Sequence, residues 1–233
     1  MSLTPVAPEI SVVIPVHNGE RYLAESIRSV LDQGHAALEL LVIDNGSTDA
    51  TADVVRTFSS VRYFHLAEKG VSKALNYGLE QCRGAFLAFL DADDVWPPNR
   101  LAIQLDAFTR NPTVEMVFGY VEQFISPELE ESAKSKLTIR DRLLPGRHRG
   151  CMLIRKESFW KVGRFEPSIE YGEFIDWYMR AEEQEIRELM LPNVLTLRRI
   201  HGGNLGFTDR NKRVEYARAL KRGLDRRRRL SKE

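Results

Sequence analysis

Short apolar runs alternate with stretches of helical periodicity over the first 110 residues of this 233-residue chain. We predict strands at 10–15, 38–43, 61–66 and 85–90, because each run is apolar and rich in β-branched or aromatic residues. A helix is expected after each strand, at about 20–33, around Val54 to Phe58, at 71–82 and from Pro97 to about 110. This alternation predicts an α/β fold whose parallel sheet carries helices on both faces.

The pattern is more mixed after residue 110. Strands are predicted at 114–124, 151–154 and 194–200, and helices at 156–162, 173–183 and 207–230. Residues 126–149 are polar, charged and weakly periodic, so we expect a mobile loop with some helix there. No internal repeat or clear linker is present, which favours a single domain.

Composition excludes several classes of protein. Hydrophobic residues make up 43% and charged residues 29%, which is unlike a disordered or coiled-coil chain. No run approaches the roughly 20 apolar residues needed to span a bilayer, and the N-terminus lacks the order of a signal peptide. Cys82 and Cys151 have no metal-ligand spacing and look like core residues of a reducing compartment. We therefore expect a soluble cytoplasmic protein.

Polar residues follow three of the predicted strands: His17 and Asn18 after the first, Asp44 and Asn45 after the second, and Asp91 to Asp94 after the fourth. Ligands of parallel α/β sheets bind at the carboxyl ends of the strands. The sequence therefore predicts a binding site where these three strand ends converge.

The segment Leu90–Asp94 (LDADD) places three carboxylates within four residues. Two like charges about 4 Å apart cost roughly 4 kcal/mol at an effective dielectric constant near 20, and a cation relieves that cost. Hard divalent cations such as Mg²⁺ and Mn²⁺ prefer oxygen ligands. The alternative is a solvated acidic turn in which Asp94 caps the next helix, but the position beside two other polar strand ends favours a metal.

Several phosphate-binding and hydrolase motifs are absent. No G-x-G-x-x-G follows the first strand, and neither G-x-x-x-x-G-K-[ST] nor G-x-S-x-G occurs in the chain. A dinucleotide dehydrogenase is thus poorly supported and a P-loop NTPase is excluded. A nucleotide can still be held by Asp44, whose carboxylate can accept hydrogen bonds from a base or ribose; the alternative is an Asx-turn residue before Asn45-Gly46.

Four sequence blocks occur in one order and spacing: SVVIPVHNGERYLAESIRSVLDQ, ELLVIDNGSTDAT, KGVSKALNYGLEQCRG and AFLAFLDADDVWPPNRL. Together they resemble the inverting family 2 glycosyltransferases of the GT-A fold. The resemblance is dense over 9–110 and looser at 151–165, 172–183 and 201–204. It implies a mostly parallel central sheet flanked by helices, in one catalytic domain over 1–205. The nucleotide-binding half would be about 9–110 and the acceptor half about 111–205, with 206–233 a basic C-terminal helix or tail.

The resemblance implies metal-dependent transfer of a sugar from a nucleotide diphosphate sugar, most often a UDP-sugar, to a hydroxyl acceptor. The acceptor would be a saccharide, a lipid-linked or another hydroxyl compound of cell-surface polysaccharide or glycoconjugate synthesis, and the cofactor Mn²⁺ or Mg²⁺. Two alternatives are a nucleotide-sugar binding protein without turnover and a sugar-phosphate nucleotidyltransferase. The latter needs a Gly-rich phosphate loop that residues 17–20 do not supply.

The family's site residues carry over to matching positions of this chain. The nucleotide-sugar contacts would be Pro15, Val16, His17, Asp44, Lys69, Lys73, Asn76, Asp91, Ala92 and Asp93. Asp93 would be the main metal ligand, with Asp91, Asp94 and His201 as further candidates. His17 occupies a position where the family usually has tyrosine. Leu75 occupies a position where many members have an arginine, and Lys69 or Lys73 can replace the charge of that arginine. The alternatives are an exposed loop imidazole for His17 and a solvated helix face for the lysines.

The candidate general base departs from the family pattern. Members often carry Glu-Asp in the acceptor helix with the Asp as base, but this chain has Phe174 at the Asp position. Glu173 and Asp176 are three residues apart and lie on neighbouring parts of one helical face. One can face the cleft while the other pairs with Arg180. We favour Asp176 over Glu173; the alternative is that both are structural.

Charge is unevenly distributed along the chain. The whole chain has 34 basic and 33 acidic residues, which argues against nucleic acid as a partner. From Arg198 to Glu233, however, 13 Lys or Arg residues stand against four acidic ones. Such a segment can lie on anionic lipid at the inner face of a membrane or attract an anionic donor. A solvated helix face is the alternative.

Overall fold

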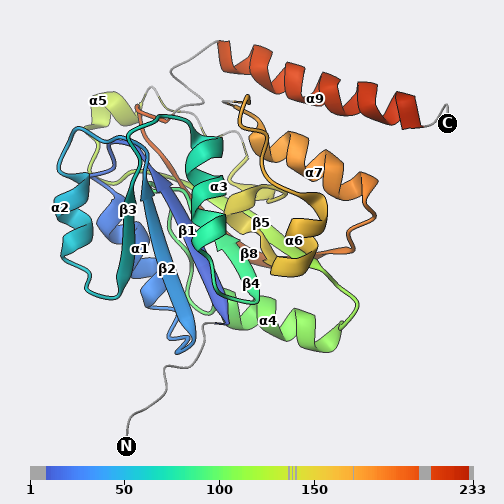
Figure 1. Cartoon of the computed structure of the whole chain (residues 1–233). Helices are drawn as coiled ribbons and strands as arrows, with labels where there is room; N and C mark the ends of the chain where they lie inside the picture. The colour runs from blue at the N-terminus through green and yellow to red at the C-terminus, as the bar shows by residue number, and fades with distance from the viewer. Residues whose placement is uncertain are drawn as a thin grey trace, which may run out of the picture.

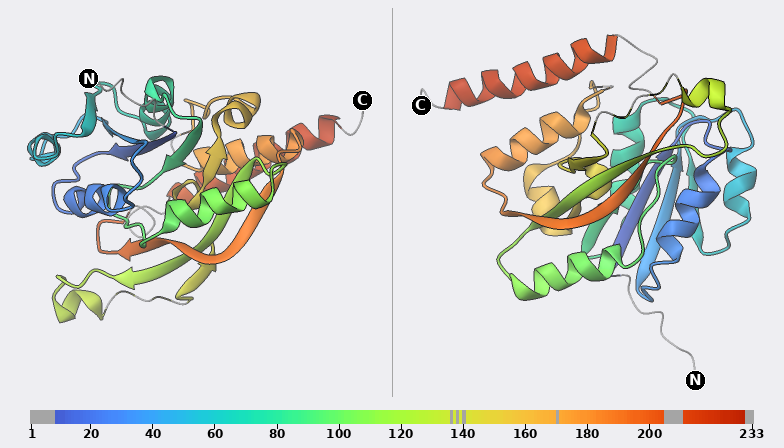
Figure 2. Two further views of the ribbon diagram at one scale, coloured as in Figure 1. Left: turned by 90° about the horizontal axis from the view of Figure 1, so that it is seen from below. Right: turned by 180° about the vertical axis from the view of Figure 1, so that it is seen from behind.

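The computed structural model describes residues 9–135, 137, 139, 141–169, 171–204 and 211–230. Its centre is an eight-stranded sheet in the order β3-β2-β1-β4-β7-β5-β6, with β8 pairing to β5 and helices on both faces (Figures 1 and 2). The strands are β1 Ile10–Val16, β2 Leu38–Asp44, β3 Val61–His65, β4 Phe86–Phe89, β5 Met116–Ile125, β6 Leu143–Pro145, β7 Leu153–Arg155 and β8 Glu188–Ile200. The helices are α1 Leu23–Leu31, α2 Thr51–Arg56, α3 Val71–Gln81, α4 Arg100–Arg110, α5 Glu131–Lys134, α6 Lys156–Val162, α7 Glu173–Glu183 and α9 Asn211–Leu230, with a 3₁₀ turn η1 at Arg149–Cys151.

The first four strands form the parallel sheet that the alternating pattern predicts. β1 pairs in parallel with both β2 and β4, so that Val13 lies between Leu41 and Phe89. The chain runs outward from β1 through β2 to β3 and then returns to place β4 on the other side of β1. The strand order therefore reverses between β1 and β4, which is where open α/β sheets bind their ligands.

Helices bury both faces of this sheet, which explains why its strands are apolar throughout. All seven residues of β1 are buried. Val12 and Ile14 belong to one core with residues of α1, α2 and α4, whereas Val13 belongs to a second core with residues of α3, α6 and α7. A strand covered on both faces has no solvent side and shows no polar alternation.

The second half makes the sheet mixed. β7 runs antiparallel to β4 and β5, β6 runs antiparallel to β5, and β8 runs parallel to β5. β8 is longer than the strand predicted at 194–200, and its pairing with β5 is irregular where Pro192 and Asn193 fall between the partners of Phe118 and Tyr120. A proline cannot donate a ladder hydrogen bond, so the first part of β8 did not look like a strand.

The stretch 126–149 contains more regular structure than expected. It contains α5 and the three-residue strand β6, and it ends at the start of η1. Positions 136, 138 and 140 lie outside the described residues. β6 is too short to show any periodicity, so only its pairing with β5 identifies it as a strand.

The C-terminal helix α9 lies alongside α7 (Figure 1). Ala219 and Gly223 of α9 are buried, and a Cβ on Gly223 would be 2.3 Å from Met179 Sδ of α7. The first residues of the helix predicted at 207–230 lie outside the described residues. Cys82 and Cys151 are buried and unpaired, as predicted. No helix in the described ranges is long and apolar enough to cross a bilayer.

Candidate active site

The loops after β1 and β2 are joined by hydrogen bonds at the carboxyl edge of the sheet. The backbone N–H of Asn18 donates to Ser47 Oγ at 2.8 Å, and Asn18 Oδ1 accepts from the backbone N–H of Thr48 at 2.8 Å. Gly19 N–H donates to Thr51 Oγ1 at 2.8 Å. Asn18 adopts a left-handed conformation with φ of 54°, which asparagine tolerates better than most residues. These bonds hold the two loops together at the carboxyl edge of the sheet.

Asp44 lies at the end of β2 and is 1% exposed. Its Oδ1 accepts from the N–H of Ser47 at 2.8 Å, and its Oδ2 accepts from the Tyr63 hydroxyl at 2.6 Å. Burial and the neighbouring Asp44 raise the pKa of Tyr63. Each carboxylate oxygen has a second lone pair, so Asp44 can still accept a hydrogen bond from a base. His17 is exposed beside it, with Nδ1 3.1 Å from the carbonyl oxygen of Asn45.

The three candidates from 69 to 76 have different surroundings. Lys69 is exposed and lies against Gly46 in the turn after β2. A Cβ built on this glycine would be 3.7 Å from Lys69 Cγ. Lys73 forms an ion pair with Glu68. Asn76 is 6% exposed, and its amide donates to Phe165 O at 2.8 Å and accepts from Phe165 N at 3.0 Å. Lys69 therefore stays beside the strand ends, whereas Asn76 ties α3 to the acceptor half.

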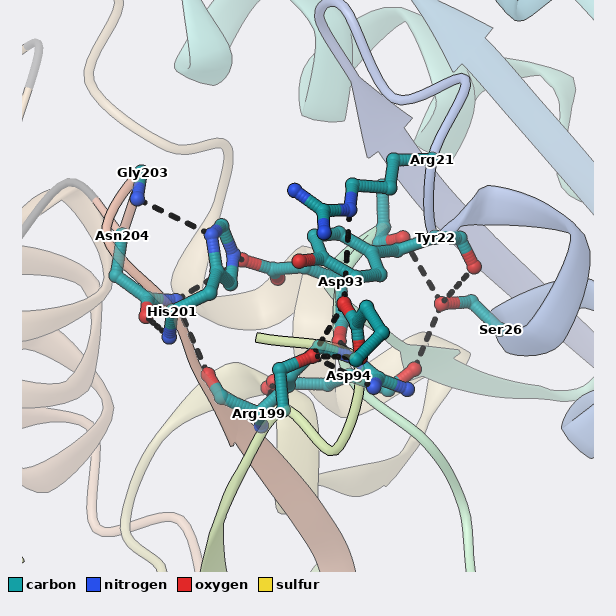
Figure 3. Close-up of polar contacts among 12 residues, drawn as sticks. Arg21, Tyr22, Ser26, Asp93, Asp94, Arg199, His201, Gly203 and Asn204 are labelled. Carbon is teal, nitrogen blue, oxygen red and sulfur yellow. Dashed lines mark hydrogen bonds and ion pairs between the residues drawn. The ribbon is translucent and has the colours of Figure 1, made fainter. Parts of the chain in front are cut away.

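Asp93 and His201 are brought together although 108 positions separate them. His201 Nε2 is 3.1 Å from Asp93 Oδ2, and Asn204 Nδ2 donates to the same oxygen at 3.2 Å. His201 Nδ1 accepts from the Gly203 N–H at 3.2 Å, which leaves Nε2 as the protonated nitrogen of a neutral ring. Figure 3 shows this turn after β8 lying against the Asp-rich loop, next to Tyr22, whose ring centroid is 4.7 Å from that of His201.

Asp94 is 3% exposed and serves to anchor β8. Its Oδ1 accepts from the N–H of Arg199 at 3.0 Å, and its backbone oxygen accepts from Ser26 Oγ at 2.7 Å. Burial and the neighbouring charges of Asp93 and Asp91 raise its pKa well above the ordinary value. It does not cap α4, which begins after Asn99 with no side-chain cap. The helix cap considered from the sequence is therefore wrong, and the role of Asp94 as a metal ligand stays a prediction.

A partly buried arginine that the sequence analysis did not single out lies between two candidate carboxylates. Arg149 in η1 forms ion pairs with Asp91, which follows β4, and with Glu173, the first residue of α7. Burial disfavours charge on Asp91, but the nearby Arg149 guanidinium outweighs it and lowers the pKa of that carboxyl. Asp91 and Glu173 in turn raise the pKa of Arg149 despite its own burial. The loop after β4 is thereby linked to α7.

Two donor groups near this cluster lack partners among the described residues. They are Nε of Arg149 and Nε2 of His148, both shielded from solvent. His148 Nδ1 accepts from the Gly150 N–H at 3.0 Å, so Nε2 carries the proton of the neutral ring. Burial lowers the pKa of His148 to about 4.

The two carboxylates of α7 point in different directions. Asp176 pairs with Arg180 at 3.0 Å and with Arg226 of α9 at 3.1 Å. Only Glu173 reaches the cluster with Asp91 and Arg149. The two carboxylates therefore have separate partners, Glu173 toward Asp91 and Asp176 toward α9. Phe174, at the position where the family has Asp, is 7% exposed and packs beside Phe118 and Trp177 in the core.

The described residues contain no group of three or more His, Cys, Asp or Glu side chains placed to hold a metal ion. Asp93 and His201 form a pair, whereas Asp91 is engaged by Arg149 and Asp94 by Arg199. Mg²⁺ is commonly held by one or two carboxylates together with substrate phosphates. The Asp93 carboxylate, which is partly open to solvent, therefore suits a cation that binds together with a diphosphate, and His201 can join it only in the tautomer that carries its proton on Nδ1.

Three contributors to this cleft carried no usable sequence signal. Arg149 falls in the stretch predicted to be a mobile loop, and Tyr63 reads only as an aromatic strand residue. Arg199 was counted with the charges of the tail, yet it donates to the backbone of Asp93 at 3.0 Å and pairs with Glu25 at 2.5 Å. Tyr63 and Arg199 acquire their partners through sheet pairing, and Arg149 acquires its partners from the turn η1, none of which single-sequence patterns report.

The sheet has helices on both faces and carries acidic residues where its strand order reverses, as in α/β proteins that bind ligands at this position. Sequence comparison identifies the family within this class. The family model for glycosyl transferase family 2 matches residues 11–163. An uncharacterized glycosyltransferase of Rickettsia typhi is 30% identical over 232 residues, covering 93% of this chain and 71% of the relative. The Escherichia coli UDP-Glc:alpha-D-GlcNAc-diphosphoundecaprenol beta-1,3-glucosyltransferase WfgD is 33% identical over 157 residues, covering 62% of this chain and 58% of the relative. The chain belongs to glycosyl transferase family 2 and is a glycosyltransferase.

Solved structures show the same fold. Staphylococcus aureus TarS 1–349 in complex with UDP-GlcNAc superimposes with a TM-score of 0.71 at 18% identity, covering 92% of this chain and 65% of that one. The mannosyltransferase PcManGT from Pyrobaculum calidifontis, in complex with GDP-Man and Mn²⁺, gives 0.67 at 20% identity, covering 98% and 67%. The GT-A fold expected from the four sequence blocks is confirmed.

Proposed function

We propose that this chain transfers a sugar from a UDP-sugar to a hydroxyl acceptor with inversion at the anomeric carbon. The observation that carries the proposal is the link from Asp91 through Arg149 to Glu173, which sets a donor-side carboxylate opposite a candidate base at the switch point of the sheet. The printed names of WfgD and of the TarS complex, which contain UDP-Glc and UDP-GlcNAc, support UDP as the nucleotide.

The donor is proposed to lie across the ends of β1, β2 and β4. Pro15, Val16 and His17 would line the nucleoside pocket, and Asp44 would accept a hydrogen bond from the base. Lys69, which lies beside Gly46 in the turn after β2, would approach the phosphates. Asp93 and His201 would hold Mn²⁺ or Mg²⁺ beside the diphosphate. A bound cation supplies Lewis-acid stabilisation of the negative charge that builds on the leaving diphosphate. The Mn²⁺ in the PcManGT complex supports this assignment.

Glu173 is proposed as the general base. An acceptor hydroxyl must lose its proton as it attacks, and a carboxylate within hydrogen-bond reach can take it. Arg149 orients Glu173 toward the donor side, whereas Asp176 is held by Arg180 and Arg226. Direct attack from the face opposite the diphosphate inverts the anomeric centre. A carboxylate in this position supports turnover rather than binding alone, although Phe174 replaces the usual aspartate.

The acceptor is proposed to be lipid-linked, in synthesis of a cell-surface glycan at the cytoplasmic face of a membrane. The name of WfgD, which includes a diphosphoundecaprenol acceptor, supports this substrate class. Peripheral membrane contact through the basic helix α9 belongs to the same proposal.

Isothermal titration calorimetry of UDP with and without Mn²⁺ tests the donor site. We expect the wild type to bind UDP more tightly with Mn²⁺, and Asp93→Asn to lose that enhancement. Asp106→Asn is a matched control, because Asp106 is an exposed carboxylate on α4 away from the strand ends. Absence of UDP binding in the wild type, or an unchanged Mn²⁺ effect in Asp93→Asn, would contradict the proposal. Hydrolysis of UDP-Glc, UDP-GlcNAc and GDP-Man would then rank the donors.

A further inference from the structure

The inner face of α9 is fixed against α7 by ion pairs and close packing. Arg226 contacts Asp176 at 3.1 Å and Glu183 at 2.6 Å, and Arg227 pairs with Glu182. Ala219 is 1% exposed between the two helices. The orientation of α9 about its own axis is therefore set, and so is the face that it turns outward.

One flank of α9 carries an apolar ridge, formed by Tyr216, Leu220 and Leu224, and Tyr216 also contacts the start of α7 at Gly172. These residues are 42%, 46% and 50% exposed, and their spacing of four places them along one side of the helix. In the described part of the chain, Leu143 is the one other large hydrophobic residue exposed to this degree. Isolated exposed leucines are ordinary on protein surfaces, but three large residues in a row mark a binding surface.

The helix that carries the ridge is strongly basic in sequence. From Asn211 to Leu230 the sequence has nine Lys or Arg residues against two acidic ones. Exposed side chains beside the ridge include Lys221 and Arg228. A helix with an apolar stripe flanked by lysine and arginine is typical of segments that lie in the plane of a membrane interface.

We propose that the ridge and its flanking cations dock on the surface of a lipid bilayer that contains anionic lipids. The ridge is suited to insertion at the level of the acyl chains, and the cations to contact with lipid phosphates. A second copy of this helix is a poor occupant, because it would bring like charges together.

The position of α9 gives docking a consequence for catalysis, and this step rests on the proposed function. Tyr216 packs against Gly172, the residue before Glu173. A Cβ built on this glycine would lie 3.1 Å from Tyr216 Cδ1. Burial, together with the charge of Glu173, raises the pKa of the Tyr216 phenol. A bilayer at the ridge would thus lie beside the start of α7, which carries the proposed base Glu173.

Vesicle co-sedimentation tests the docking surface without using activity. Wild-type protein is mixed with vesicles of phosphatidylcholine alone or of phosphatidylcholine with phosphatidylglycerol. We expect strong binding only to the anionic vesicles, weakened by added salt because surface charge is screened. Leu220→Ser/Leu224→Ser and Lys221→Glu/Arg228→Glu should each reduce the bound fraction by about fivefold or more. Leu143→Ser is the control for an exposed leucine elsewhere, with circular dichroism checking the fold of every variant.

Two outcomes would overturn the inference: absence of wild-type binding to anionic vesicles, or binding that both double variants retain in full. Sedimentation velocity without lipid tests whether a second copy of the protein binds at the ridge instead. A dimer that Leu220→Ser/Leu224→Ser dissociates, in a protein that does not bind vesicles, would assign the ridge to self-association. UDP calorimetry on the same samples separates the two proposals, because vesicle binding without UDP binding would contradict the proposed function alone.

Discussion

The carboxylates of this protein differ in role because they differ in partner. Asp93 faces His201, Asp94 accepts from the backbone of Arg199, and Asp91 pairs with Arg149. All three come from one five-residue segment. A tight turn sends adjacent side chains in different directions, so neighbours in sequence acquire separate tasks.

The two carboxylates of α7 give a direct test at the residue scale. We expect Glu173→Gln to lower turnover by about 10²- to 10⁴-fold, because the amide cannot accept the acceptor proton. Asp176→Asn should change turnover little but lower stability, since it weakens the contacts to Arg180 and Arg226. Release of UDP from the donor, followed alongside thermal unfolding, measures both effects. The reverse pattern would return the base to Asp176.

His148 should make stability depend on pH. Its pKa falls to about 4 in the folded protein, while the unfolded chain has a value near 6.5. The unfolded state therefore takes up the proton first, and stability decreases as the pH falls from about 6.5 to about 4. The loss should be on the order of 2–3 kcal/mol. Asp91, with its lowered pKa, acts in the same direction at lower pH, and Asp94, with its raised pKa, acts in the opposite one.

Comparison of wild type with His148→Gln isolates the contribution of the imidazole. Urea unfolding of both proteins at neutral and mildly acidic pH should show a shallower decline for the variant. Parallel declines would mean that His148 takes up its proton equally in the folded and unfolded states.

At the scale of secondary-structure elements, β8 connects the two halves of the site. Its pairing with β5 carries Arg199 and His201 to the Asp-rich loop, and Val95 forms an isolated bridge to Leu197. The turn over His201–Asn204 then meets Asp93. The position of the candidate metal ligands thus depends on the register of a strand from the second half of the chain.

The contact between α7 and α9 is the second element-scale feature. Arg226→Ala removes a partner from Asp176 and Glu183, whose side chains are 6% and 10% exposed. Asp176 keeps Arg180, so we expect a loss of about 1–2 kcal/mol in the free energy of unfolding rather than the larger cost of an unpaired buried charge. Arg110→Ala, at an exposed ion pair on α4, should cost less than about 0.5 kcal/mol. Equal losses in urea unfolding would show that α9 is not held by this contact.

For the molecule as a whole, Arg100 joins the donor half to the acceptor half. This α4 side chain is fully buried and donates to the carbonyl oxygens of Gly150 at 2.5 Å, Leu195 at 3.0 Å and Met152 at 3.3 Å. Its guanidinium also lies 4.0 Å from the ring centroid of Trp96. Burial lowers its pKa to about 9, so it remains charged at neutral pH.

Removal of this buried cation tests whether the two halves fold together. Arg100→Met leaves carbonyl groups of η1 and β8 short of a donor, and we expect the protein to lose about 2–4 kcal/mol of stability. The wild type should unfold in one transition, with tryptophan fluorescence and circular dichroism coinciding. Two separate transitions in the wild type, or an unchanged stability in the variant, would contradict this account.

The first four strands and their helices were predictable because burial on both faces leaves continuous apolar runs, and helices leave a period that short windows detect. The helix at 173–183 was found with its bounds for the same reason. The strand β6 and the first part of β8 were missed, because three residues show no period and Pro192 interrupts the other. In the site, the strand-end positions of Asp44 and the Asp-rich loop followed from chain order alone.

Local periodicity and chain order were thus sufficient for the fold class and for the edge of the sheet where the ligand is expected, and the resemblance of four sequence blocks was sufficient for the family. The choice between Glu173 and Asp176, the insertion of Arg149 and the docking of α9 required three-dimensional contacts. The physical reason is distance along the chain. Arg149 and Asp91 are 58 positions apart and Arg226 and Asp176 are 50 apart, so their pairing is set by sheet register and helix packing, which no short window of sequence contains.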